Sequence, residues 1–357
     1  MKNIFKIFLS SGLVFLFLPG CVDQIDLDPP SGLTEAIVIQ GRAVLGDNSR
    51  VELRVSRLFD FSAESRLSLN VKDVVFFDDQ GNEMALEPVN QGEYNTPILP
   101  SSPIQLEVGR SYGIRMATFD NRSYESSLDI LNDNNPIGSV RFAHKEELEA
   151  NPIGDVVSTT KVETFVNTTL SPGSNGLLWE LDQTYQLTDT PPEGDPKTCY
   201  ITSPVTVNKL PILRASLESG ASNIENNSVA VQPIDFRMAE GMNITVRQFS
   251  LSQGAAEYWD NAAVLVEREG DLFDDPVGLL PSNFVNPNDA NDEVFGYFFS
   301  TKEQISYARV PNSLVTDAVN ACPPPPRMEP GGTTICDDCL AGPNNNSTLI
   351  RPLFWIE

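Results

Sequence analysis

The chain has 357 residues and a formal net charge of −25 at pH 7, because 49 acidic residues outnumber 24 lysines and arginines. This length allows two domains with cores of their own. Such an acidic composition disfavours nucleic-acid binding, which needs clustered lysine and arginine, and we interpret it as a source of solubility outside the cytoplasm.

The N-terminus has the pattern of an export signal. Two lysines precede an apolar stretch, residues 7–18, which is too short to span a hydrocarbon layer about 30 Å thick. A glycine stands directly before Cys21, which resembles the lipobox of bacterial lipoproteins. We therefore predict a signal peptide over residues 1–20 and a membrane-anchoring lipid on Cys21. The alternative is an ordinary signal peptide followed by a chance cysteine.

Residues 21–33 form an acidic segment that also contains proline and glycine. We predict that it is a tether between the lipid and the folded chain. Acidic residues soon after a lipidated cysteine resemble the surface-export signals of Bacteroidota lipoproteins. The predicted location is therefore the outer membrane, with the chain facing the cell exterior, and a plain linker is the alternative.

Residues 34–132 have the pattern of short β-strands. Val51, Leu53 and Val55 alternate with charged residues, as a half-buried strand requires. Similar runs recur about every ten residues and are separated by turn signals such as residues 78–82. This spacing predicts an N-terminal β-sandwich of an immunoglobulin-like or transthyretin-like kind.

A polar stretch at residues 132–136 marks a predicted boundary, and residues 133–357 read as a larger β-rich domain. One amphipathic helix is expected at about 252–268, with Ser252 as its N-cap. We interpret Trp259 as a core residue of this helix, with ligand stacking as the alternative. The predicted apolar stripe of the helix consists of Ala255, Trp259, Ala262 and Val266.

Four cysteines follow Cys21, and an even number in an exported chain indicates disulfides. Four cysteines allow three pairings, and the sequence does not choose among them. The last two have the CxxC spacing of redox and metal sites, but they lie in a loop with two acids between them, which does not favour a thiolate. We predict two structural disulfides, with metal and redox sites as alternatives. The four residues are Cys199, Cys322, Cys336 and Cys339.

Few residues suggest catalysis. His144 is the only histidine and lies in a charged segment that we expect to be exposed, so any Ser-His-Asp or Cys-His mechanism would depend on it. The sequence lacks the motifs of zinc peptidases, esterases, phosphate loops and dinucleotide sites. Paired carboxylates would suffice for a glycosidase, and the acidic loops also suit Ca²⁺, but we interpret them as solvated turns. The candidates are Asp274, Asp275, Asp289, Asp292 and Glu293.

Several segments in a fixed order resemble one family. They are residues 37–41, residues 244–252 followed by Glu257-Tyr258-Trp259, residues 270–276, residues 294–298, and the Cys336–Cys339 pair followed by residues 351–355. Together they resemble a Bacteroidota lipoprotein family that is known only as domain of unknown function 4249. The resemblance covers nearly the whole chain after residue 21.

The resemblance implies a companion of TonB-dependent transporters of the outer membrane. We therefore expect a non-enzymatic accessory or ligand-capturing protein with no cofactor beyond the lipid at Cys21. The alternatives are a surface glycan or peptide hydrolase that uses carboxylates, and an envelope assembly or structural lipoprotein. Trp259, Phe354 and Trp355 are candidates for an interface, although core packing explains them equally well.

Overall fold

The computed structural model describes residues 36–58, 67–133, 135–151, 153–170, 173–207, 209–214, 223–267, 280, 282–322, 334–341 and 346–356. The predicted signal peptide, Cys21, the tether, Asp274 and Asp275 lie outside these residues. The described part is mainly β, which confirms the predicted fold class. Within it, no helix combines the length and hydropathy that crossing a membrane requires.

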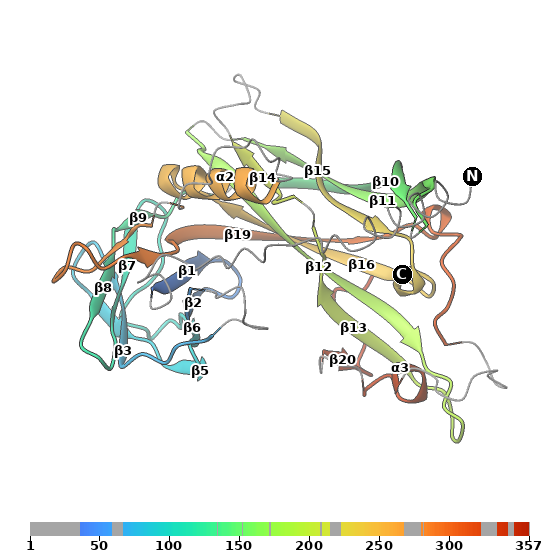
Figure 1. Cartoon of the computed structure of the whole chain (residues 1–357), viewed down its shortest axis with the longest axis horizontal. Helices are drawn as coiled ribbons and strands as arrows, with labels where there is room; N and C mark the ends of the chain where they lie inside the picture. The colour runs from blue at the N-terminus through green and yellow to red at the C-terminus, as the bar shows by residue number, and fades with distance from the viewer. Residues whose placement is uncertain are drawn as a thin grey trace, which may run out of the picture.

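The N-terminal strands form a β-sandwich (Figure 1). Alternating apolar residues of its two sheets, such as Ile39, Leu53, Phe76 and Ile114, fill the space between them. One sheet contains β1 (Ile37–Leu45), β2 (Arg50–Arg57), β6 (Glu93–Pro97) and β5 (Pro88–Asn90). The other contains β3 (Asp73–Asp78), β4 (Glu83–Ala85), β7 (Ser111–Ala117), β8 (Ser123–Ser126), β9 (Asp129–Ile130) and β17 (Phe284–Val285).

The later strands build a second core. Its buried residues include Trp179, Leu181, Ile244 and Val246. One side is formed by β12 (Gly176–Thr188), β13 (Thr198–Pro204), β14 (Ile212–Arg214), β16 (Met242–Ser250) and β19 (Phe298–Arg309). The other is a three-stranded sheet of β10 (Ile137–Ala150), β11 (Val156–Thr169) and β15 (Asn223–Pro233). Short 3₁₀ turns lie at Phe236–Met238 and Asn312–Leu314.

One sheet runs through both halves. Strand β1 pairs in parallel with β19, and β18 (Val294–Phe295) pairs with the start of β1. Through this pairing, eleven strands of the described chain form a single sheet from β20 (Ser347–Thr348) to β5. Figure 1 shows β19 running from the N-terminal sandwich into the second core. Phe284, Val294 and Phe298 accordingly belong to the first core, although they lie late in the sequence.

The predicted helix is present as α2 (Gln253–Glu267), and Ser252 caps it, because the backbone N–H of Ala255 donates to Ser252 Oγ at 3.1 Å. Its first turns pack on Leu178, Phe249 and Phe299. The predicted stripe is wrong at its end, because Val266 is 55% exposed. The last turn contributes no residue to this apolar cluster. The helical spacing of apolar residues in the sequence therefore extends beyond the part of α2 that is packed against the sheet.

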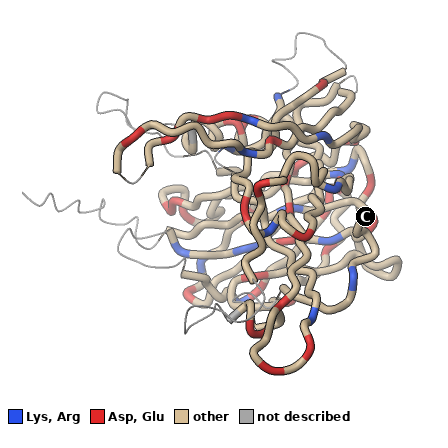
Figure 2. Tube along the Cα trace, turned by 90° about the vertical axis from the view of Figure 1, so that its right-hand side faces the viewer, with Lys and Arg blue, Asp and Glu red and all other residues tan. Residues whose placement is uncertain are grey.

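Both predicted disulfides form. Cys199 of β13 pairs with Cys339, and Cys322 pairs with Cys336 of the short helix α3 (Thr334–Asp337). The fully buried carboxylate of Asp189 accepts hydrogen bonds from the backbone N–H groups of Lys197 and Cys339, at 2.6 and 3.2 Å. The C-terminal segment is thereby held to the β12–β13 hairpin. Figure 2 shows acidic residues at the tip of this hairpin and along the β10–β11 hairpin.

Candidate functional site

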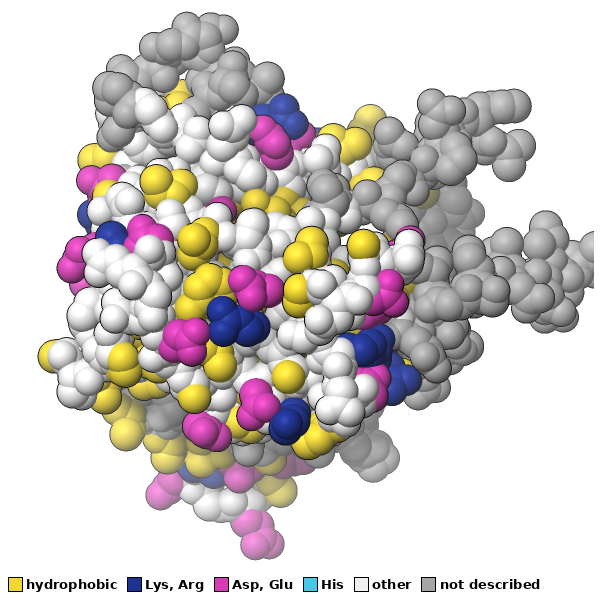
Figure 3. Space-filling view, turned by 90° about the vertical axis from the view of Figure 1, so that its left-hand side faces the viewer, with side chains coloured by type: hydrophobic (Ala, Val, Ile, Leu, Met, Phe, Trp, Pro, Cys, Tyr) yellow, Lys and Arg dark blue, Asp and Glu magenta, His cyan; other side chains and the backbone are white. Residues whose placement is uncertain are grey.

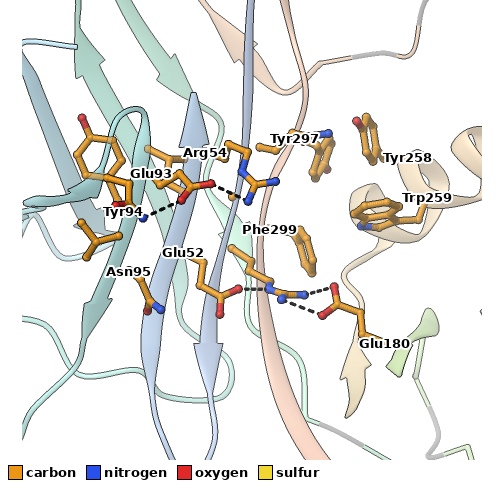
Figure 4. Close-up of a pocket in the computed structure, with 16 residues that line it drawn as sticks. Glu52, Arg54, Glu93, Tyr94, Asn95, Glu180, Tyr258, Trp259, Tyr297 and Phe299 are labelled. Carbon is orange, nitrogen blue, oxygen red and sulfur yellow. Dashed lines mark hydrogen bonds and ion pairs between the residues drawn. The ribbon is translucent and has the colours of Figure 1, made fainter. Parts of the chain in front are cut away.

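A pocket of about 530 Å³ lies where the two halves of the chain meet (Figure 4). Its size falls within the usual range of small-molecule sites. One wall is aromatic and is formed by α2, by Tyr297 and by the start of β19. The opposite wall and the floor are polar and belong to β1, β2, β5, β6 and β12. Its lining includes the side chains of Gln40, Arg42, Glu52, Arg54, Asn90, Glu93, Asn95, Glu180, Tyr258, Trp259, Tyr297 and Phe299.

The polar floor follows from strand alternation. In β1, Ile39 and Ala43 point into the sandwich core, which leaves Gln40 and Arg42 on the opposite face. In β2, Leu53 is likewise in the core and Glu52 is not. Because Arg42 pairs directly with Glu52 in the antiparallel register, the two charged side chains meet on the pocket side.

Arg42 joins the two halves of the chain. Its Nε donates to Glu52 at 2.6 Å, and Nη1 and Nη2 donate to the two carboxylate oxygens of Glu180 in β12, at 2.7 and 3.0 Å. The guanidinium also lies 4.4 Å from the ring centroid of Phe249. Burial alone would lower the pKa of Arg42, but the carboxylates of Glu180 and Glu52 raise it above its ordinary value, so the group remains charged.

The remaining charges of this face are also paired. Arg50 contacts Glu52 at 2.5 Å and the buried Glu303 of β19 at 3.0 Å. Burial acts to raise the pKa of Glu52, but Arg42 and Arg50 outweigh it and hold that pKa below its usual value. Glu52 therefore remains ionised and is poorly suited to act as a general acid.

Nearer the mouth, Arg54 contacts Glu93 at 2.8 Å, and Asn90 Nδ2 donates to Glu93 at 3.2 Å. The side chains of Gln40, Asn90 and Asn95 are exposed there. The mouth of the pocket therefore presents amide groups, which both donate and accept hydrogen bonds.

The aromatic wall consists of four rings. Tyr258 and Tyr297 stack with their centroids 4.8 Å apart, and Trp259 meets the edge of Phe299 at 6.1 Å. The Tyr258 side chain also hydrogen-bonds Gln40, which ties α2 to β1. Among the described residues, the buried Nε1 of Trp259 has no hydrogen-bond partner. The four rings of the wall are therefore already packed on one another without a ligand, and the wall contains one hydrogen-bond donor without a partner.

Backbone geometry places Tyr297 in this wall. Residues 294–295 and 298–302 pair with β1 in the same register, but Gly296 between them has φ of +96° and lies against the backbone of Ile39. The carbonyl of Tyr297 accepts from the N–H of Gly41 at 3.0 Å. This kink separates β18 from β19 directly before Tyr297, whose ring stacks on Tyr258. Gly254 of α2 lies close to the same side chain, because a Cβ there would lie 2.3 Å from the Tyr297 hydroxyl.

Asp129 connects the two elements that carry the aromatic wall. Its carboxylate accepts from Ser252 Oγ, the N-cap of α2, at 2.5 Å and from the backbone N–H of Ser300 at 2.9 Å. Burial raises the pKa of Asp129 to about 6, although both hydrogen bonds oppose this shift. One carboxyl of the N-terminal sandwich thus fixes both α2 and β19.

The predicted interface residues lie in two places. Trp259 borders the pocket, whereas Phe354 and Trp355 pack near the other end of β19. Phe354 stacks on Tyr307 with a centroid distance of 5.0 Å, and the buried Trp355 meets the edge of Tyr200 at 5.0 Å. The structure therefore does not bring the three residues together.

The described carboxylate candidates stabilise a turn. Asp292 accepts from the Tyr124 hydroxyl at 2.7 Å and from Asn286 Nδ2 at 2.8 Å, and Asp289 accepts from the backbone N–H of Asn291 at 3.0 Å. Asp289 and Glu293 are exposed, as a solvated turn requires. No group of three or more His, Cys, Asp or Glu side chains suited to a metal ion occurs in the described part of the chain. His144 is exposed in β10, with Nε2 at 2.7 Å from the carbonyl of Leu314.

The sequence did not single out Arg42, Glu180, Tyr297 or Phe299 as site residues. Arg42 and Glu180 belong to no motif of the sequence, and nothing local indicates that they meet. The available signal was the family resemblance, because Tyr258-Trp259 and Tyr297 belong to two of its segments and converge at the pocket. Residues 247–252 of the same resemblance contact the predicted boundary at residues 132–136. Gln248 donates to the carbonyl of Asn135, and Ser250 donates to that of Asn132.

Comparison with known proteins identifies a family. A family model described as "Domain of unknown function (DUF4249)" matches residues 22–305. No curated protein and no solved structure matches. The family model spans most of the chain, including both halves and every side chain of the pocket, and the protein therefore belongs to this family of unknown function.

Proposed function

We propose that this protein is a non-enzymatic, lipid-anchored outer-membrane protein that captures a ligand for a TonB-dependent transporter at the outer face of the cell. The observation that carries the capture role is the pocket at the joint between the two halves of the chain. Its location resembles that of many ligand sites, which favour the junctions between folded units.

The chemistry of the pocket favours binding over catalysis. Glu52, Glu93 and Glu180 are each engaged by an arginine, and the pKa of Glu52 is held low. A catalytic acid works best with a pKa near the operating pH, and Arg42 and Arg50 move the pKa of Glu52 away from it. A preformed aromatic wall opposite paired charges instead provides shape and hydrogen-bonding groups at little cost of reorganisation.

The anchor and the partner are proposed from the sequence. Cys21 follows a short export signal and precedes an acidic tether, and the sequence segments named above resemble lipoproteins that accompany TonB-dependent transporters. A tether of this kind leaves the folded chain free to approach the mouth of a transporter while it stays bound to the same membrane.

The partner is tested by affinity purification of the tagged full-length protein from gently solubilised outer membranes, with mass spectrometry of what copurifies. We expect a single TonB-dependent transporter in near-equal amount. A preparation without any transporter would overturn the accessory role.

The lipid anchor is tested by a variant without it, Cys21→Ala, which is also the matched control for the purification. Cys21→Ala should release the protein into the soluble fraction and remove the transporter from the purified sample, because membrane tethering raises the local concentration of the two partners. Mass spectrometry of the N-terminal peptide should show acyl chains on Cys21 in the unaltered protein. A membrane-bound Cys21→Ala protein would contradict lipid anchoring.

A further inference from the structure

We propose that the pocket binds a neutral oligosaccharide, held by the aromatic wall on one side and by amides and carboxylates on the other. The proposal deepens the ligand-capturing role proposed above and rests on it for its biological setting. The binding chemistry itself depends on the described residues of the pocket alone.

The aromatic wall fits the apolar face of a sugar ring. Trp259 and Phe299 meet edge to face, and Tyr258 and Tyr297 stack on each other, so the rings already support one another. A pyranose presents C–H groups on its faces and hydroxyls around its rim. It therefore offers apolar contact to an indole without losing the hydration of its hydroxyls.

The charges of the pocket favour a neutral ligand. Two arginines and three glutamates line it, and Arg42 and Arg54 are already engaged by Glu180, Glu52 and Glu93. An anionic ligand would have to displace a glutamate in a pocket with a small net negative charge, within a chain of net charge −25. A cation would find the carboxylates of Glu52, Glu93 and Glu180 already engaged by Arg42 and Arg54.

The polar groups suit hydroxyls. Each carboxylate has lone pairs beyond those used by its arginine, and the exposed amides of Gln40, Asn90 and Asn95 both donate and accept. A hydroxyl also donates and accepts, so it satisfies either kind of group.

A peptide is the less favoured occupant. Peptides in extended form are recognised mainly through the backbone groups of a sheet edge. The edge strand at this pocket is β5, which has three residues, begins with Pro88 and pairs irregularly with β6. Proline has no N–H to offer, so this edge provides few regular partners for a peptide backbone.

The test is isothermal titration calorimetry with the full-length protein in a detergent that contains no sugar. The probes are maltohexaose, cellohexaose, xylohexaose, mannohexaose and hexa-N-acetylchitohexaose as neutral ligands, hexagalacturonate as an anionic one, and a tryptic digest of casein as a source of peptides. We expect at least one neutral oligosaccharide to bind, with an affinity that changes less than about twofold between low and high salt because no net charge is neutralised.

Substitutions assign the binding to the pocket. Trp259→Ala should weaken the affinity at least about tenfold, whereas Trp259→Phe, which keeps an aromatic face, should weaken it less. Phe119→Ala is the matched control, because Phe119 is an exposed aromatic residue of the N-terminal sandwich that does not line the pocket. Circular dichroism of each variant checks that it is folded.

Three results would overturn the proposal: no neutral oligosaccharide binds, only hexagalacturonate or the casein peptides bind, or Trp259→Ala and Phe119→Ala bind the sugar equally. These results are independent of the transporter. Sugar binding without a copurified transporter would overturn the accessory role and leave the sugar-binding proposal standing. A copurified transporter without sugar binding would support the accessory role and overturn the sugar-binding proposal.

Discussion

Two arginines have the same kind of neighbours on the outer faces of the two sheets of the N-terminal sandwich. Arg42 lies over Phe249 between Glu52 and Glu180, and Arg115 of β7 lies over Phe77 between two glutamates. The side chain of Arg42 is 16% exposed, whereas that of Arg115 is 41% exposed.

The difference comes from the second half of the chain. Phe249 and Glu180 belong to β16 and β12, so the second half covers Arg42, while all the partners of Arg115 lie within its own sheet. Figure 3 shows the molecule from the side of the sheet that contains β7, where charged and apolar side chains share an open surface. The same local arrangement is therefore a structural joint in one place and a solvated ion pair in the other.

The largest effect is expected at the backbone of the joint. Gly296→Ala would place a Cβ 2.0 Å from the carbonyl oxygen of Ile39, at φ of +96°, so β18 and β19 would have to move away from β1. We expect a loss of about 4 kcal/mol or more in the free energy of unfolding, measured by urea denaturation.

The control for this glycine is Gly81→Ala. Gly81 also has positive φ, at +86°, but its Cβ would meet nothing within 4 Å. Gly81→Ala should therefore lower the free energy of unfolding by only about 1 kcal/mol, which is the cost of placing alanine at positive φ. Equal losses in the two variants would show that close packing on β1 contributes nothing.

The second prediction removes the buried arginine. Arg42→Met leaves Glu52 and Glu180 without their shared partner, and we expect a loss of about 2–3 kcal/mol, reduced from the fully buried case because Glu180 is 40% exposed. Adding Glu180→Gln should recover part of this loss, since it removes one unpaired charge. A loss below about 0.5 kcal/mol for the single variant would contradict the structural role of Arg42.

The third prediction concerns pH. Because the pKa of Asp129 is raised to about 6 in the folded state, the folded protein binds this proton more tightly than the unfolded chain does. Its contribution to stability is full below about pH 4 and is lost as the pH rises through 6. Asp129→Asn, which keeps an acceptor for the N–H of Ser300, should therefore be more stable than the unaltered protein by about 1–2 kcal/mol at pH 7.5.

Urea denaturation at several pH values measures this difference. The advantage of Asp129→Asn should disappear near pH 4.5, where the unaltered carboxyl is protonated in the folded state. Comparing the two proteins at each pH cancels the other carboxyls, such as Glu52, whose pKa is lowered and whose contribution therefore has the opposite sign. An advantage that does not depend on pH would contradict the assignment to Asp129.

The smallest effect is expected at the exposed arginine. Arg115→Met should change the free energy of unfolding by less than about 1 kcal/mol, because water and salt screen its contacts with Glu83 and Glu125. The difference should vanish in 0.5 M salt, a concentration at which we expect Arg42→Met to keep most of its loss. Similar salt dependence in both variants would show that the covering half of the chain does not shield Arg42.

The sequence predicted the local structure well where one short pattern decides it. The alternation of Val51, Leu53 and Val55 predicted β2, and Ser252 predicted the start of α2, which the structure confirms. The cysteine count predicted disulfides, and these are also confirmed. The helical stripe was wrong at Val266 because periodicity does not record where the covered surface ends. The lipid anchor at Cys21 stays a prediction.

The sequence by itself determined the strands, the helix and the even number of cysteines, because alternation, capping and composition act over a few residues. Only the tertiary structure decided that β1 pairs with β19, that Cys199 pairs with Cys339, and that Arg42 meets Glu180 while Tyr297 meets Tyr258. The reason is that a strand with one apolar face specifies which side it buries and leaves open which strand lies beside it. That choice depends on packing between residues far apart in the chain, and the pocket exists only once it has been made.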